Sequence, residues 1–190
     1  YSMQLDHWQL ERSPFASGFD GDHYSPSPEH DEALARLEYL VDNRRRFGLL
    51  VGEAGVGKSL ALRVVARRLA RKGCAVISID ATGIGPRDVL WQVAAGLGTA
   101  PRDDADFVRL WRDVTDRLVE NRVQQVNTAL LVDDAGVASP EVLAQIVRLG
   151  RVEWSPAARW TIVLAAEPLQ AAHWSDTLRD AIDLRIDLGP

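Results

Sequence analysis

Residues 52–59 read Gly-Glu-Ala-Gly-Val-Gly-Lys-Ser, and this stretch decides the fold. An apolar run precedes it at 47–51, and apolar residues at helical spacing follow it over 59–72. Glycines let successive backbone N–H groups point into a tight loop, and the start of a helix adds the positive end of its dipole. A loop of this composition between a strand and a helix predicts a phosphate-binding site.

The last two residues of this loop indicate which phosphate compound is bound. Lys58 is placed to reach the β- and γ-phosphates of a nucleotide, and the Ser59 hydroxyl is placed to ligate Mg²⁺. We therefore expect ATP and Mg²⁺ as ligands, with Lys58 also serving catalysis. The expected nucleotide contacts in and after the loop are Gly52, Glu53, Ala54, Gly55, Val56, Gly57, Lys58, Ser59 and Leu60.

Two carboxylates end another apolar run. Residues 129–134 read Ala-Leu-Leu-Val-Asp-Asp, as expected of a buried strand that stops at the edge of a nucleotide site. We expect Asp133 to hold Mg²⁺ and Asp134 to orient and deprotonate the attacking water. The alternative is a solvated turn that happens to contain two acids, which the phosphate-binding loop makes less attractive. Glu167 follows a further apolar run, and it either senses the γ-phosphate and positions water or is an ordinary loop carboxylate.

Short apolar runs alternate with helical patterns along the whole chain. This alternation predicts an α/β fold in which a parallel sheet is covered on both faces. The expected strands are 47–51, 75–79, 129–132, 160–164 and 184–188, and the expected helices are 29–43, 59–72, 86–97, 104–125 and one capped by Ser139.

The composition is that of an ordinary globular domain. The chain has 190 residues and a net charge of −5, which gives no general electrostatic reason to bind nucleic acid. Arginines do cluster at 44–46 and over 63–72, and we interpret both clusters as solvated faces. The single cysteine, Cys74, favours a buried structural thiol and a cytoplasmic location. No run approaches the roughly 18 apolar residues of a transmembrane helix, so no membrane span is expected.

With these motifs, the chain resembles the AAA+ ATPases and, more narrowly, the ExeA (GspA) family of general-secretion ATPases. The narrower resemblance covers most of the chain and is carried by Trp8-Gln9-Leu10, Ser13-Pro14-Phe15, Tyr24-Ser25-Pro26, His30, Glu32 to Leu37 and Leu49 to Gly55.

The resemblance implies a P-loop NTPase core of three layers, with a five-stranded parallel sheet in the order 5-1-4-3-2. It implies ATP at the carboxyl ends of the strands and assembly into homo-oligomers. Residues 1–28 contain Ser-Pro and Gly positions that predict an extended arm with turns. The resemblance implies that 29–190 form the nucleotide-binding core and end before the helical lid of the family. The family arm wraps the edge of the nucleotide, which places Tyr24 and His30 near the adenine. The alternatives are a packing anchor for Tyr24 and a helix-start residue for His30.

The chain departs from the family pattern at three positions. Members usually have Asp-Glu where this chain has Asp133-Asp134, which draws the predicted base back by about 1 Å, a misplacement that can cost ~10²-fold in rate. Glu167 stands where glutamine is frequent. The usual arginine that reaches a neighbour's nucleotide has only Arg179 and Arg185 as candidates. We therefore expect slow hydrolysis.

Three functions are compatible with these patterns. The first is an ATPase accessory to assembly or secretion, with a secretion or cell-envelope partner and a location in the cytoplasm, including the cytoplasmic domain of a membrane-associated protein. The second is a nucleotide-dependent scaffold or switch that does not hydrolyse ATP. The third is a DNA-associated ATPase of the transposition type, which the arginine clusters alone support.

Overall fold

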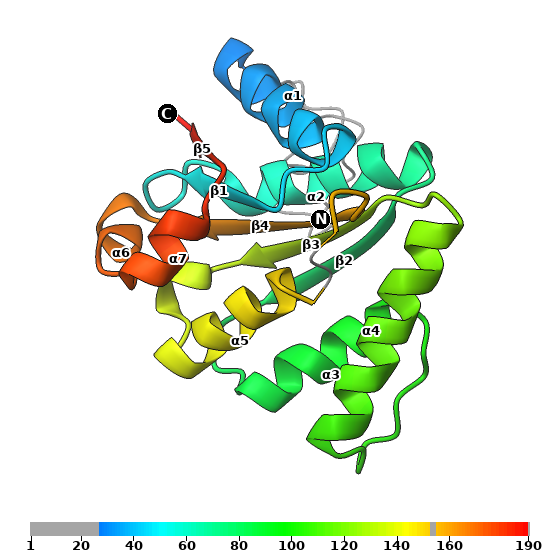
Figure 1. Cartoon of the computed structure of the whole chain (residues 1–190). Helices are drawn as coiled ribbons and strands as arrows, with labels where there is room; N and C mark the ends of the chain where they lie inside the picture. The colour runs from blue at the N-terminus through cyan, green and yellow to red at the C-terminus, as the bar shows by residue number, and fades with distance from the viewer. Residues whose placement is uncertain (1–26, 153–154, 190) are drawn as a thin grey trace, which may run out of the picture.

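A five-stranded parallel sheet lies at the centre of the molecule. In a computed structural model that describes residues 27–152 and 155–189, the strand order is β2-β3-β4-β1-β5, and every neighbouring pair is parallel (Figure 1). This is the predicted order 5-1-4-3-2 counted from the opposite edge, so the predicted fold class is confirmed. The strands are β1 (Phe47–Val51), β2 (Ala75–Asp80), β3 (Thr128–Asp133), β4 (Trp160–Ala166) and β5 (Leu184–Asp187).

Helices cover both faces of this sheet and give the domain three layers (Figure 1). Because side chains alternate along a strand, Leu50 of β1 packs into the cluster under α1 and α2, whereas its neighbours Leu49 and Val51 pack on the opposite side with α3, α4 and α5. The helices are α1 (Pro28–Asp42), α2 (Lys58–Arg71), α3 (Pro86–Gly96), α4 (Phe107–Val123), α5 (Pro140–Gly150), α6 (Pro168–Ala172) and α7 (Asp176–Ala181), with a 3₁₀ turn η2 (Ala135–Val137).

The boundaries of several elements differ from those expected. Ser139 caps α5 as predicted, since its hydroxyl accepts the amide of Val142 at 3.3 Å. Helix α4 begins later than expected, because the side chain of Asp106 accepts the amide of Arg109 at 2.7 Å and sets the first turn there. The short helices α6 and α7 were not predicted, since neither is long enough to show a helical period.

The strand register brings the predicted functional segments to one edge of the sheet. Val51, the last residue of β1, lies opposite Ala166 of β4 and Asp187 of β5. Asp133, which ends β3, lies opposite Asp80, which ends β2. Since all five strands are parallel, the loops that follow them share this carboxyl edge.

The two helices on one face are joined by ion pairs around Glu38. Its carboxylate on α1 lies 3.2 Å from Nη1 of Arg68 and 2.5 Å from Nζ of Lys72, both at the end of α2. Burial raises the pKa of the Glu38 carboxyl, but hydrogen bonds from Lys72 and Arg68 outweigh it, so the net pKa is lowered. Part of the basic stretch of α2 is therefore paired, not simply solvated.

Replacing Glu38 with glutamine should lower the free energy of unfolding at pH 7 by about 1 kcal/mol, because two charged partners lose their carboxylate. A lowered folded pKa stabilises the fold above the unfolded pKa near 4.5 and loses that contribution as the pH falls through the folded value. Urea unfolding at pH 7 and well below pH 4.5 should therefore show a difference that disappears in acid. Glu32→Gln is the control on the same helix, because the exposed Glu32–Arg36 pair should contribute almost nothing.

Cys74 lies half-buried between α2 and β2. Burial, with a smaller effect of the Asp42 charge, raises the pKa of this thiol to about 11. A thiol with so high a pKa is almost entirely protonated at neutral pH and is unreactive, in line with the structural role expected of it. Within the described residues, no helix combines the length and apolar character needed to cross a membrane.

Candidate functional site

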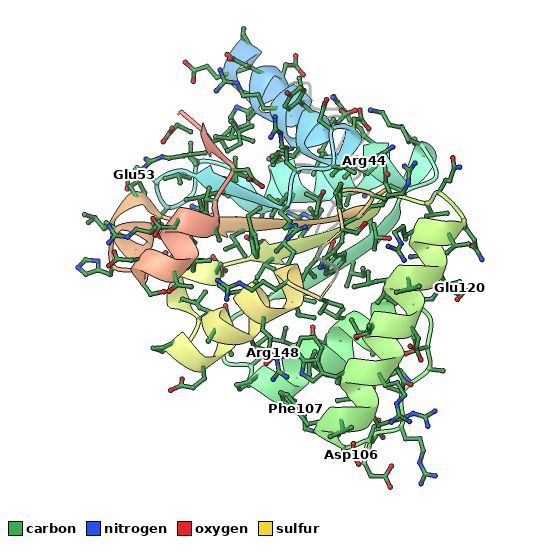
Figure 2. All side chains as sticks on the ribbon, in the orientation of Figure 1. Arg44, Glu53, Asp106, Phe107, Glu120 and Arg148 are labelled. Atoms are coloured by element: carbon green, nitrogen blue, oxygen red, sulfur yellow. The ribbon has the colours of Figure 1, made fainter. Side chains whose placement is uncertain are left out.

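The loop between β1 and α2 has the conformation expected of a phosphate-binding loop. Gly55 and Gly57 have φ of 78° and 103°, in the left-handed region that only glycine adopts without strain. Gly52 has no room for a side chain, because a Cβ there would lie 2.6 Å from Cγ1 of Val56 and 3.0 Å from the carbonyl oxygen of Leu188. Glu53 is exposed at the tip of the loop (Figure 2). The glycine spacing is thus required by the backbone.

Lys58 is folded back onto this loop. Its Nζ donates to the carbonyl oxygens of Gly52 at 2.8 Å and Glu53 at 2.9 Å, and the residue is only 8% exposed. The helix that it begins has no side-chain cap at Gly57, so the first backbone N–H groups of α2 have no partner from the cap residue. Such N–H groups, together with a lysine ammonium held beside them, favour an anion at this point.

His30 supports the loop from the first turn of α1. Its Nε2 lies 3.1 Å from the carbonyl oxygen of Val56, and its Nδ1 lies 2.8 Å from Oγ of Ser27. A carbonyl only accepts hydrogen bonds, so Nε2 carries a proton and donates it. A Cβ at Gly57 would lie 3.2 Å from the same Nε2. The structure therefore places His30 against the phosphate-binding loop, while Tyr24, the other expected adenine neighbour, lies outside the described residues.

Asp133 and Asp134 stand at the end of β3 as expected. Asp134 has φ of 49°, a left-handed conformation that aspartate tolerates better than most residues, and its amide donates to Oδ1 of Asp133 at 3.0 Å. Burial raises the pKa of the Asp134 carboxyl, and the charges of Asp133, Asp80 and Glu167 raise it further, while Lys58 lowers it. The predicted catalytic residues Lys58 and Glu167 thus lie close enough for their charges to act on the Asp134 carboxyl.

Asp80 belongs to this acidic cluster and was not predicted. It ends β2 directly opposite Asp133, and its Oδ1 accepts the amide of Thr82 at 2.8 Å, which lowers the pKa of its carboxyl. The signal in the sequence was an acid immediately after the apolar alternation of residues 75–79. The predicted strand order 5-1-4-3-2 set strand 2 beside strand 3, so the order and this acid together could have placed Asp80 at the site.

Gln170 joins the two loops that carry the acids, and it was also missed. Its Oε1 accepts the backbone amide of Glu167 at 3.2 Å. The same side chain packs against η2, because a Cβ at Gly136 would lie 1.9 Å from that Oε1. Glu167 itself precedes α6 as its N-cap residue. The loop after β3 and the loop after β4 are therefore in direct contact.

Comparison with known proteins places this site in a family. The family described as AAA domain matches residues 41–174, most of the chain, including the phosphate-binding loop and both acid-bearing loops. The chain belongs to this family.

Known relatives agree with the assignment. General secretion pathway protein A of Aeromonas hydrophila is 27% identical over 166 residues, 87% of this chain and 30% of the relative. The crystal structure of Cdc6p from Pyrobaculum aerophilum has a TM-score of 0.67 at 19% identity, over 88% of this chain and 47% of that one. The Aeropyrum pernix ORC2 protein, in ADPNP-ADP complexes, has a TM-score of 0.65 at 14% identity, over 88% and 50%. The expected resemblance to the secretion protein is confirmed, and this chain spans about a third of that relative's length.

The AAA domain offers a donor set that suits Mg²⁺ beside a nucleotide. Strands β1 and β3 flank β4, so the phosphate-binding loop and Asp133 are separated by two strand spacings, or about 10 Å. Mg²⁺ is usually held by one or two protein oxygens plus phosphate and water, and Ser59 and Asp133 are of this kind. Among residues 27–152 and 155–189, no group of three or more His, Cys, Asp or Glu forms a metal cage of its own.

The two candidate arginines of the AAA domain are paired within their own segments. Arg179 on α7 pairs with Asp176, and Arg185 on β5 lies 2.8 Å from Asp187. Both side chains are about half exposed. These ion pairs do not join Arg179 or Arg185 to the phosphate-binding loop.

Proposed function

We propose that this AAA domain binds ATP with Mg²⁺ and hydrolyses the β–γ phosphoanhydride slowly. The observation that supports it best is Lys58, whose buried ammonium is held by two loop carbonyls next to the open start of α2. A cationic side chain held against its own backbone can exchange those carbonyls for phosphate oxygens with little rearrangement. The nucleotide-bound complexes of the Aeropyrum pernix ORC2 protein show that a similar fold accepts such ligands.

Different residues of the loop would contact different parts of the triphosphate. The N–H groups from Gly55 to Ser59 surround the phosphates, and Lys58 reaches the β- and γ-phosphates. The Ser59 hydroxyl and Asp133 would hold Mg²⁺, which neutralises the charge that develops on the phosphate oxygens. His30 keeps the loop in the required shape through the carbonyl of Val56.

Asp134 is the proposed base for hydrolysis. A water oxygen forms a bond to the γ-phosphorus, the bond from that phosphorus to the bridging oxygen breaks, and the proton of the water passes to the Asp134 carboxylate. The products are ADP and inorganic phosphate. The raised pKa of Asp134 makes it a better proton acceptor than an ordinary aspartate. Its short side chain and the charge of Glu167 near the γ-phosphate both slow the step.

We further propose that nucleotide turnover drives an assembly or secretion process from the cytoplasm. In that role the domain would act as a homo-oligomer together with a secretion or cell-envelope partner. The support is the likeness to a general secretion pathway protein over nearly the whole chain. Only 30% of that relative is matched, so the secretion role and its partner are proposed for this chain and do not follow from the match alone.

Purified protein should release phosphate from ATP only when Mg²⁺ is present, and Asp133→Asn should lower that rate by about 100-fold, because the metal loses its protein carboxylate. The measurement is a coupled phosphate assay at several Mg²⁺ concentrations. Asp116→Asn removes an exposed acid from α4, outside the site, and serves as the control. Phosphate release at background for the unaltered protein would argue against hydrolysis.

A switch that binds nucleotide without turnover is the second candidate, and Asp134 with Glu167 favours it. In that case ATP binding would be intact while phosphate release stayed at background. The third candidate, a DNA-associated ATPase, draws support only from the arginines, and a mobility shift that weakens steeply with salt would reveal it.

A further inference from the structure

A groove separate from the phosphate-binding loop lies between α5 and the α6–α7 segment. Its volume is about 780 Å³, within the roughly 300–1,000 Å³ of natural binding clefts. Ala138, Pro140, Leu143, Ala144 and Val147 make one apolar wall, and Gln170 and His173 belong to the other. We call this hollow the α5–α6 groove.

Two exposed apolar side chains stand next to groove-lining residues in the sequence, although neither lines the groove itself. Val137 is 55% exposed and Leu169 is 76% exposed, which makes them two of the most exposed large apolar residues in the described part of the chain. Val137 immediately precedes the lining residue Ala138, and Leu169 immediately precedes Gln170. An apolar hollow whose lining segments also carry exposed apolar side chains is typical of a site that binds another polypeptide.

The charge of the groove is opposite to that of the whole chain. No aspartate or glutamate of the described residues lines it, whereas Arg148 and Arg151 do, in a chain whose net charge is −5. Arg148 is held in place because its guanidinium lies 4.6 Å from the ring centroid of Trp111 on α4 (Figure 2). Beyond Arg151, a second hollow of about 800 Å³ adds the arginines at 44–46, together with two aspartates.

Some of the groove lining belongs to the segments that directly follow the candidate catalytic acids. Asp134 lies two residues before Gly136 on one wall, and Glu167 donates its amide to Gln170 on the other. Gly136 and Gln170 are in contact, as the absence of room for a Cβ at 136 shows. The acid-bearing segments and the groove lining therefore share the contact between Gly136 and Gln170.

We propose that the α5–α6 groove docks an acidic amphipathic helix of a partner protein, and that docking is coupled to the nucleotide site. Apolar side chains at i, i+3, i+4 and i+7 would enter the groove, and carboxylates beside them would face Arg148 and Arg151. Docking depends on the groove alone, whereas the coupling rests on the proposed binding of ATP.

The test uses a fluorescent peptide of about 16 residues, roughly four helical turns, with leucines on one face and glutamates along both margins. Fluorescence anisotropy should show saturable binding, which a shuffled peptide of the same composition lacks. Ala144 is exposed on α5, so Ala144→Glu adds a carboxylate to the groove without removing a packed side chain. This variant should weaken binding at least tenfold, since its carboxylate would face the carboxylates of the peptide. Ala144→Lys should retain or strengthen it.

A charge reversal gives an independent check. Arg148→Glu/Arg151→Glu should lose the acidic peptide and gain a version with lysine in place of glutamate. Arg67→Glu/Arg71→Glu changes the charge equally on α2, away from the groove, and should leave acidic peptide binding unchanged. Equal losses in the two double variants, or binding only to nucleic acid or to a second copy of this chain, would overturn the docking proposal, as would no binding of the acidic peptide.

The coupling is measured by repeating the titration with Mg²⁺ and a non-hydrolysable ATP analogue. Peptide affinity should change several-fold, and the change should be absent in Lys58→Ala. If calorimetry detects the analogue on the unaltered protein but peptide affinity does not move, the coupling is wrong while the proposed nucleotide site stands. If calorimetry detects no analogue, the proposed function fails and docking is judged from the nucleotide-free titration alone.

Discussion

Lys58→Ala should lower the affinity for ATP by about 100-fold or more. The ammonium is the only side-chain cation that the described loop brings to the phosphates, and a charged hydrogen bond of this kind contributes up to about 3 kcal/mol, which corresponds to roughly 100-fold in Kd. In the nucleotide-free protein the same ammonium donates to the carbonyls of Gly52 and Glu53. The substitution should therefore weaken mainly the complex with ATP. Calorimetric titration with a non-hydrolysable ATP analogue and Mg²⁺ measures it.

Arg63→Ala is the matched control for this variant. Arg63 is an exposed cation on the same helix, one turn further on, and its removal should leave nucleotide affinity nearly unchanged. Thermal unfolding of both variants should show that each is folded. If Lys58→Ala binds the nucleotide as tightly as the unaltered protein does, the phosphates lie elsewhere.

The sequence predicted the sheet and the loop because both depend on local patterns. Residues 47–51 are all buried in β1, and such a run can be recognised without knowing its neighbours. The glycines at 55 and 57 have the positive φ that the loop requires, and their spacing from Lys58 is fixed by the chain itself. The strand order, in contrast, came from the family resemblance and not from these patterns.

The parts that were missed depend on contacts between segments distant in sequence. Asp80 joins the acidic cluster because β2 pairs with β3, and that pairing was predicted from the family resemblance, not from any local pattern near residue 80. Gln170 reaches Gly136 across two loops, and α6, which carries it, has only five residues and no helical period to detect. His30 contacts Val56, 26 positions away, which no local pattern indicates, and its place near the adenine stays a prediction.

Asp134→Asn should lower ATP turnover by about 100-fold while making the protein more stable. The amide cannot accept the proton of the attacking water, and the loss of a general base lowers the rate by roughly 10²- to 10⁴-fold. The folded pKa of Asp134 is raised, so its charge destabilises the fold once the pH exceeds the ordinary value of 3.8, and the penalty is complete above the folded pKa. Asparagine removes that charge and also tolerates the left-handed φ of 49°. Phosphate release and urea unfolding at pH 7 should therefore change in opposite directions.

Asp134→Glu lengthens the side chain of the proposed base while keeping its negative charge, so it tests whether the length of that side chain limits hydrolysis. The longer carboxylate recovers about 1 Å toward the γ-phosphate, so turnover should rise, with ~10²-fold as the ceiling for a misplacement of that size. Glutamate is less tolerant of the left-handed conformation at this position, at a cost of about 1 kcal/mol, so the melting temperature should fall. Faster phosphate release from a less stable protein would identify the short side chain as the cause of slow hydrolysis. Unchanged turnover would instead point to the charge of Glu167, and then Glu167→Gln should accelerate the reaction where Asp134→Glu did not.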